Sequence, residues 1–101
     1  MCIRDSHPTA AVCGTPTDVA KQLINDLEKM NRGRYAAPVG WIDANGDGEI
    51  AIALRCGLLL DDKKSMRIFA GCGIVAGSDP ETEFAESQAK LMPMRTALEM
   101  L

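Results

Sequence analysis

The sequence has no surplus of basic residues and no long apolar run. Its formal net charge is −3, and a protein that binds nucleic acid usually gathers positive charge instead. No apolar stretch approaches the roughly 18 to 20 residues that span a bilayer, and residues 1–6 lack the apolar core of a signal peptide. We therefore expect no nucleic-acid partner and no membrane segment.

The sequence also lacks closely spaced cysteines. Cys2, Cys13, Cys56 and Cys72 lie far apart, and His7 is the only histidine, so the spacing of a zinc site is missing. We interpret the cysteines as free thiols in a reducing cytoplasm. The composition, with 47% hydrophobic and 25% charged residues, is that of a soluble globular protein.

The 101 residues suffice for one small domain with a modest core. Residues 1–6 show no periodicity, cap or turn signal, and we interpret them as a non-native or junction segment. Residues 7–101 carry the organised pattern.

A first helix is predicted from Thr15, which can cap it, with Pro16 in the first helical position. Apolar residues recur at helical spacing as far as Met30, and Gly33 offers a left-handed cap. Ser78 to Glu81 repeat the cap-and-proline signature and predict a final helix. Pro93 should kink or interrupt that helix.

Between the helices, short apolar runs at 38–42, 49–54 and 66–75 predict three strands. Residues 45–48, Asn-Gly-Asp-Gly, supply the positive-φ positions of a tight hairpin, and the charged residues 61–64 make a second turn. The order predicts an α+β fold: a helix, a three-stranded antiparallel meander and a helix.

The segment from Asp43 to Ile50 copies the first eight positions of an EF-hand calcium loop. At the twelfth position, where a bidentate glutamate must close the coordination shell, the chain has Leu54, and the flanks are strands where an EF-hand needs helices. We therefore predict a hairpin.

Glu83, Glu86 and Lys90 fall on one face of the final helix, because i, i+3 and i+7 lie within about 60° of one another. Two carboxylates one turn apart can hold magnesium with water and a substrate carboxylate. From spacing alone, a solvated face with a Glu86–Lys90 pair is the simpler interpretation.

Three further features can serve chemistry. Arg55 ends an apolar run, where a guanidinium seldom lies without a partner, and either an internal carboxylate or a ligand could pair with it. The glycines of residues 71–77 let a ligand approach backbone N–H groups. His7 can carry protons or be a hydrogen-bonded strand residue, and the second is the simpler reading.

Read together, these segments resemble the C-terminal part of the chorismate-utilising enzymes, most closely the isochorismate synthases. Four blocks occur in the family's order. They are His-Pro-Thr-Ala-Ala-Val-Cys-Gly-Thr-Pro at 7–16, Gly-Trp-Ile-Asp at 40–43 with Ile-Ala-Leu-Arg-Cys at 52–56, Phe-Ala-Gly-Cys-Gly-Ile-Val-Ala-Gly at 69–77, and Glu-Phe-Ala-Glu-Ser-Gln-Ala-Lys-Leu at 83–91.

The resemblance implies a magnesium-dependent addition of water at C2 of chorismate with loss of the C4 hydroxyl, which gives isochorismate. It implies that Glu86 binds Mg²⁺ with Glu83 beside it, and that His7 lies near the reacting ring. The residues that it implies for substrate binding are Arg55, the Gly71 backbone and Lys90 at the carboxylates, with Tyr35, Ala11, Val12, Leu54 and Phe69 lining the pocket.

In the resembled family, the catalytic base and acid and another magnesium-binding glutamate lie upstream of the His-Pro-Thr block, in a part that this chain lacks. We therefore predict no isochorismate synthase activity for the chain alone, because positioned acid and base groups each contribute about 10²- to 10⁴-fold. We also expect unpaired strand edges and an uncovered apolar face, which favour aggregation.

Alternatives remain open. Within the family, the His-Pro-Thr start at 7–9 and the Gly-Thr-Pro ending at 14–16 favour the isochorismate and salicylate branch. Anthranilate-type enzymes usually have Gly-Ala-Pro-Lys where this chain has residues 14–17, use ammonia and need a glutaminase partner. Menaquinone, siderophore and salicylate pathways are all compatible with the resemblance. A non-catalytic α+β interaction module is the alternative from a different class.

Overall fold

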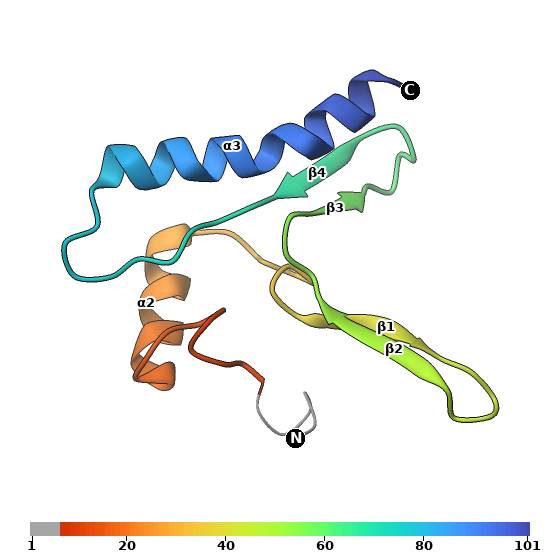
Figure 1. Ribbon diagram of the computed structural model, residues 1–101, viewed down its shortest axis with the longest axis horizontal. Coiled ribbons are helices and arrows are strands. Elements are labelled where there is room, and N and C mark those ends of the chain that lie inside the picture. Colours follow the sequence, from red (N-terminus) through yellow and green to blue (C-terminus); the bar gives the residue numbers. More distant parts are fainter. Residues whose placement is uncertain (1–6) are drawn as a thin grey trace. The chain divides into compact units, whose positions relative to one another are not determined.

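The computed structural model describes residues 7–101, so our interpretation of residues 1–6 lies outside the described part. The chain divides between Ala53 and Leu54 into two compact units. The first holds helix α2 (Thr17–Glu28) and strands β1 (Pro38–Ile42) and β2 (Gly48–Ile52). The second holds strands β3 (Cys56–Leu59) and β4 (Met66–Phe69) and helix α3 (Pro80–Glu99) (Figure 1). The predicted α+β class is confirmed.

Helix α2 begins one step later than predicted. Pro16 is the N-cap residue, in extended conformation, and no side chain caps the helix. The predicted cap at Thr15 is therefore wrong, because the chain enters the helix only at Thr17. The Thr17 hydroxyl donates to the Gly14 carbonyl at 3.3 Å, which ties the helix start to the turn before it.

The helix also ends earlier than predicted. Lys29, with φ 49°, is the left-handed C-cap. Gly33 is left-handed as well, at φ 56°, but it lies four residues beyond the cap. The amide of Gly33 donates to the Asn31 side chain at 2.8 Å. The glycine therefore serves a separate turn.

Strands β1 and β2 form the predicted antiparallel hairpin, with Pro38 opposite Ile52 and Ile42 opposite Gly48. Asp43 Oδ1 accepts from the backbone amides of Asn45 and Asp47 at 2.9 and 3.0 Å. The side chain that would be the first ligand of a calcium loop instead fixes the hairpin turn, as the hairpin prediction required.

The predicted three-stranded meander is wrong, because the chain forms two separate two-stranded sheets, β1–β2 and β3–β4. Ala53 still exchanges backbone hydrogen bonds with Ala36 and Ala37, both at 2.9 Å. Arg55 then adopts φ 43°, which turns the chain out of the extended conformation. The predicted strand 49–54 therefore ends at Ile52, and a new strand, β3, follows the turn.

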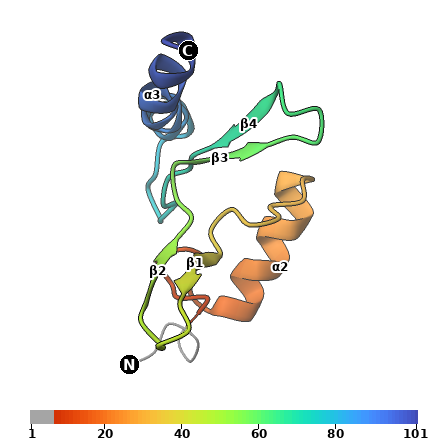
Figure 2. The ribbon, with the colours of Figure 1, turned by 90° about the vertical axis from the view of Figure 1, so that its right-hand side faces the viewer.

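Within residues 7–101, strand β3 pairs with β4 alone, with Cys56 opposite Phe69 and Leu59 opposite Met66 (Figure 2). Asp62 closes their turn: its Oδ1 accepts from the amides of Lys64 and Ser65, both at 2.9 Å. Strand β4 ends at Phe69, and residues 70–75 are irregular rather than the predicted strand.

Helix α3 begins as predicted. Asp79 caps it by accepting from the Thr82 amide at 2.9 Å and the Thr82 hydroxyl at 2.8 Å, and Pro80 takes the first helical position. Of the two effects predicted for Pro93, a kink or an interruption, the interruption does not occur, since the helix runs for 20 residues to Glu99.

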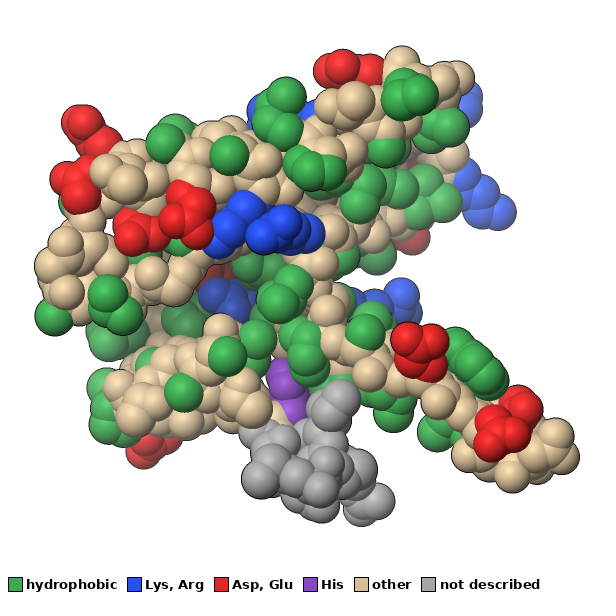
Figure 3. Space-filling model, viewed as in Figure 1, with side chains coloured by type: hydrophobic (Ala, Val, Ile, Leu, Met, Phe, Trp, Pro, Cys, Tyr) green, Lys and Arg blue, Asp and Glu red, His purple; other side chains and the backbone are tan. Residues whose placement is uncertain are grey.

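Little of the described chain is buried. Ala53, at 9% exposure, is the only buried hydrophobic residue between positions 7 and 101, whereas Ile42, Val75 and Phe84 are 67 to 72% exposed. Hydrophobic side chains are visible over the surface of both units (Figure 3). The expected uncovered apolar surface is present. Within residues 7–101, neither helix has the length and apolar character needed to cross a bilayer.

Candidate active site in the second unit

The irregular segment that follows β4 lies against α3. Lys90 Nζ donates to the Gly71 carbonyl at 3.1 Å, and the same ammonium pairs with the Glu86 carboxylate. The Lys90 side chain is 24% exposed and that of Glu86 is 51% exposed. Three of the sequence-predicted site residues therefore meet at one place.

The helix geometry explains this meeting. Long side chains on an α-helix lean toward its N-terminus, so the ammonium of Lys90 lies over the preceding turn, which carries Glu86. Glu83 lies one further turn back on the same face. Acidic and basic side chains adjoin in the space-filling view (Figure 3).

Cys72 is a member of this cluster that the sequence analysis missed. Its Sγ donates to the Glu83 carbonyl at 3.4 Å. Desolvation, the hydrogen bond to Glu83 and the negative charges of Glu83 and Glu86 raise the pKa of the thiol, and the charge of Lys90 acts in the opposite direction. The sequence signal was present, since Cys72 is the one side chain between Gly71 and Gly73.

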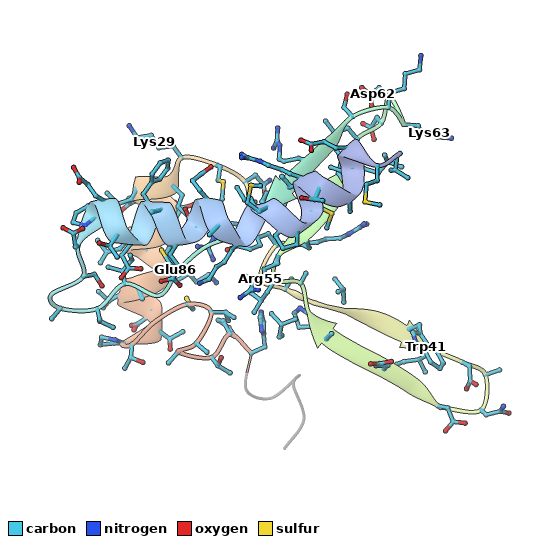
Figure 4. The ribbon with its side chains drawn as sticks, turned by 45° about the horizontal axis from the view of Figure 1, so that its top comes forward. Lys29, Trp41, Arg55, Asp62, Lys63 and Glu86 are labelled. Carbon is cyan, nitrogen blue, oxygen red and sulfur yellow. The ribbon has the colours of Figure 1, made fainter. Side chains whose placement is uncertain are left out.

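Arg55 does not have the environment that the sequence predicted. Its side chain is exposed rather than buried, and among residues 7–101 no carboxylate forms an ion pair with it. Figure 4 shows Glu86 on α3 and Arg55 on the connection that leads into β3. A guanidinium with open donors can bind a carboxylate through two parallel hydrogen bonds.

Two of the predicted pocket-lining residues lie close to these groups in sequence. Leu54 precedes Arg55 and is 54% exposed. Phe69 is the last residue of β4, two positions before Gly71, and is half-buried. Both belong to the second unit, as do Glu83, Glu86 and Lys90.

The other predicted site residues belong to the first unit. Ala11 and Val12 lie in a turn in which the Val12 amide donates to the Thr9 carbonyl at 3.1 Å. The Arg32 guanidinium lies 5.2 Å from the ring centre of Tyr35. The Nδ1 atom of His7 is buried and has no hydrogen-bond partner among the described residues, so a proton donor or acceptor from outside them would satisfy it.

A cavity of about 600 Å³ lies at the end of α2, lined by residues between Lys21 and Arg32. No predicted site residue is among those that line it. Its charged groups are in part paired with one another, since Glu28 binds Arg32 through a bond of 2.7 Å to Nε. We therefore place the candidate site at α3 and not at this cavity.

The donor set at α3 suits a hard cation in part. Glu83 and Glu86 offer carboxylate oxygens one turn apart, the ligand type that magnesium prefers. In the described part of the chain no cluster of three or more His, Cys, Asp or Glu side chains is placed to hold a metal. The two glutamates would fill only part of an octahedral shell, which magnesium commonly completes with water and substrate oxygens.

The glycine-rich segment that follows β4 lies against a helix face that carries a carboxylate paired with an ammonium group. This arrangement is suited to bind an anionic ligand together with a cation. A profile of the family described as "chorismate binding enzyme" matches residues 1–99, and the chain belongs to this family. The resemblance predicted from the four sequence blocks is confirmed.

Isochorismate synthases are among the relatives. The chain is 49% identical over 96 residues to isochorismate synthase MenF of Bacillus subtilis, covering 95% of the chain and 20% of that protein. It is 47% identical over 92 residues to isochorismate synthase DhbC of the same organism, covering 91% and 23%. It is 44% identical over 93 residues to anthranilate synthase component 1 of Saccharolobus solfataricus, covering 92% and 22%. The chain thus spans about a fifth of the length of these relatives.

Proposed function

We propose that this chain is part of an isochorismate synthase, an isomerase that adds water at C2 of chorismate with loss of the C4 hydroxyl. The observation that carries the proposal is the meeting of Glu86, Lys90 and the Gly71 carbonyl on one face of α3. Its support from comparison is the 49% identity to a relative with this name.

Glu86 and Glu83 would hold Mg²⁺, with the remaining positions left to water, substrate and other parts of the protein. When bound, magnesium would hold the ring carboxylate of chorismate and stabilise the charge that develops during the displacement. Lys90 would exchange one of its present acceptors, the Glu86 carboxylate or the Gly71 carbonyl, for a substrate carboxylate. Arg55 would bind a carboxylate through its exposed guanidinium.

The remaining residues would shape the pocket. Tyr35, Leu54 and Phe69 would contact the substrate, together with Ala11 and Val12. His7 would lie near the reacting ring, where its buried Nδ1 atom could accept or donate a hydrogen bond. The catalytic acid and base would come from the upstream part of the same enzyme.

We also infer a cytoplasmic location. The described cysteines are not joined in disulfides, as is usual in a reducing compartment. The product would feed menaquinone, siderophore or salicylate biosynthesis.

The test uses a hybrid enzyme, in which this chain replaces the matching segment of B. subtilis MenF. Calorimetry with Mg²⁺ and chorismate should show that each ligand tightens the other, because binding free energies are reciprocal. The hybrid should produce isochorismate from chorismate, and the 101-residue chain alone should not. If the hybrid binds neither ligand, a non-catalytic module is favoured.

An anthranilate-type synthase is the second candidate, because the relative from S. solfataricus carries that name at 44% identity. It would use ammonia in place of water. Supplying the hybrid enzyme with ammonium separates the two, since an anthranilate-type site would give an aminated product and an isochorismate synthase would not. Release of pyruvate without an aminated product, in the absence of ammonium, would indicate the salicylate branch.

A further inference from the structure

The neighbouring residues Gly71 and Cys72 each form one hydrogen bond with α3. The Gly71 carbonyl accepts from Lys90 Nζ at 3.1 Å, and the Cys72 thiol donates to the Glu83 carbonyl at 3.4 Å. Glu83 and Lys90 are seven residues apart, about 10 Å along the helix axis. The two contacts therefore enclose the stretch of α3 that carries Glu86.

The two contacts differ in what they can do during binding. Lys90 is a long, flexible side chain, and its ammonium is one of the groups that would move to the substrate. The Cys72 thiol is short and lies next to the backbone, and the helical carbonyl that it reaches has a second lone pair to accept it. The thiol contact can therefore persist when Lys90 leaves Gly71.

No other side chain of this segment can replace that contact. Gly71 and Gly73 flank Cys72 and carry no side chain, and a Cβ atom at Gly73 would meet nothing within 4 Å. The thiol is also within electrostatic reach of Glu83, Glu86 and Lys90, since all three charges act on it. The cysteine thus interacts with the same charged groups that form the candidate site.

We infer that Cys72 is a positioning residue, whose thiol holds the Glu83 turn of α3 at a fixed distance from the Gly71 backbone. The inference rests on the proposed function, because the spacing it maintains is that between the metal-binding carboxylates and the backbone that faces the substrate. In this proposal Cys72 itself would touch neither metal nor substrate. It would act on magnesium affinity through Glu83.

The test compares three variants of the hybrid enzyme. Cys72→Val keeps the approximate volume and removes the donor, whereas Cys72→Ser restores a donor. Cys13→Val is the matched control, because the Cys13 thiol donates to the Thr17 carbonyl at 3.6 Å in the first unit. For each protein, three quantities are measured. Magnesium affinity is determined by calorimetry without chorismate, kcat is determined at saturating magnesium, and the melting temperature is recorded.

Cys72→Val should weaken magnesium binding about 10-fold, which is the lower end of the loss seen when a group that orients a metal ligand is removed. The magnesium affinities of Cys72→Ser and Cys13→Val should stay within about twofold of that of the unchanged hybrid. At saturating magnesium, kcat should be close to that of the unchanged hybrid. In a second measurement that needs no variant, magnesium with chorismate should slow alkylation of Cys72 more than that of Cys13.

Equal magnesium affinity for Cys72→Val and the unchanged hybrid, or equal losses in Cys72→Val and Cys13→Val, would overturn the inference. So would alkylation of Cys72 at the same rate with and without the ligands. Each of these results leaves the proposed function standing if the unchanged hybrid still binds magnesium and chorismate. Failure of the unchanged hybrid to bind either one counts against the proposed function itself.

Discussion

The two hairpins of this chain are alike at their turns and differ along their strands. In both turns an aspartate side chain, Asp43 or Asp62, accepts two backbone amides and so fixes the reversal. The β1–β2 strands are exposed at almost every position. The β3–β4 hairpin ends in the half-buried residues Ile68 and Phe69 and contacts α3.

The difference shows what each hairpin contributes. The turn chemistry is local, so both hairpins form their reversals from a few residues. The last strand of the second hairpin, β4, contacts α3 of its own unit and leads directly to Gly71 and the site. The first hairpin presents Trp41 and Ile50, 57% and 48% exposed. We expect the upstream part of the proposed enzyme to cover them.

The largest expected effect is in the second unit, on the helix α3 that the second hairpin contacts. Glu86→Gln in the hybrid enzyme should lower kcat/KM at limiting magnesium by at least about 100-fold, because a metal ligand contributes more than the groups that orient it, whose loss costs about 10- to 100-fold. Glu81→Gln, in the first turn of the same helix, is the control and should have little effect. Similar losses in both variants would place the site elsewhere on α3.

A smaller effect is expected in the first hairpin, where the strands approach closely. A Cβ atom at Gly40 would lie 2.0 Å from the Glu49 carbonyl oxygen, whereas one at Gly73 would meet nothing within 4 Å. Gly40→Ala should therefore destabilise the hybrid by about 1 to 3 kcal/mol, the usual cost of overpacking. Gly73→Ala should change the free energy of unfolding much less, as denaturant titration can measure.

If Gly40→Ala proves as mild as Gly73→Ala, the hairpin separates its strands at little cost. The exposed first hairpin would then be a loosely held element. The two hairpins would then differ in rigidity as well as in how far other parts of the protein bury them.

Acid should weaken the second turn in a defined pH range. Hydrogen bonds from the Ser65 hydroxyl and from the amides of Lys64 and Ser65 lower the pKa of Asp62. The stabilisation is therefore fully present above the unfolded value of about 3.9 and is lost as the pH falls through the lower, folded value. The Lys64 and Ser65 amide NMR shifts, followed from about pH 6 to pH 2, should titrate with a midpoint below about 3.9.

Asp62→Asn keeps an acceptor and removes the titration, so it serves as the control. The amide shifts of its turn should be flat across the same range. A midpoint at or above the unfolded value in the unchanged chain would mean that the turn does not favour the charged carboxylate.

Local chemistry explains which parts of the fold could be predicted from the sequence. The Asn-Gly-Asp-Gly turn and the Asp79–Pro80 helix start each depend on residues adjacent in sequence, and both were predicted correctly. The end of β2 could not be read in this way, because it depends on a positive φ at Arg55, a residue type with no preference for that conformation. The continuous run of apolar residues concealed the break.

The candidate site shows the same limit. Helical spacing placed Glu83, Glu86 and Lys90 on one face, and the Glu86–Lys90 pair is present. The contacts of Gly71 and Cys72 with α3 join residues 19 and 11 positions apart, so spacing within one element could not reveal them. The resemblance to a family supplied the role of Gly71, and neither the resemblance nor the spacing drew attention to Cys72.

The smallest expected effect concerns the solvent exposure of the first hairpin in the hybrid enzyme. Trp41 is the only tryptophan of the chain, so its fluorescence reports on this hairpin alone in the 101-residue protein. In the hybrid enzyme its contribution is the difference between the unchanged protein and Trp41→Phe. If another part of the enzyme covers the hairpin, the emission of Trp41 should lie at shorter wavelength in the hybrid than in the isolated chain, and iodide should quench it less, because the indole leaves water. Equal emission and quenching in both proteins would mean that the first hairpin faces solvent in the enzyme as well, and that cover does not distinguish the two hairpins.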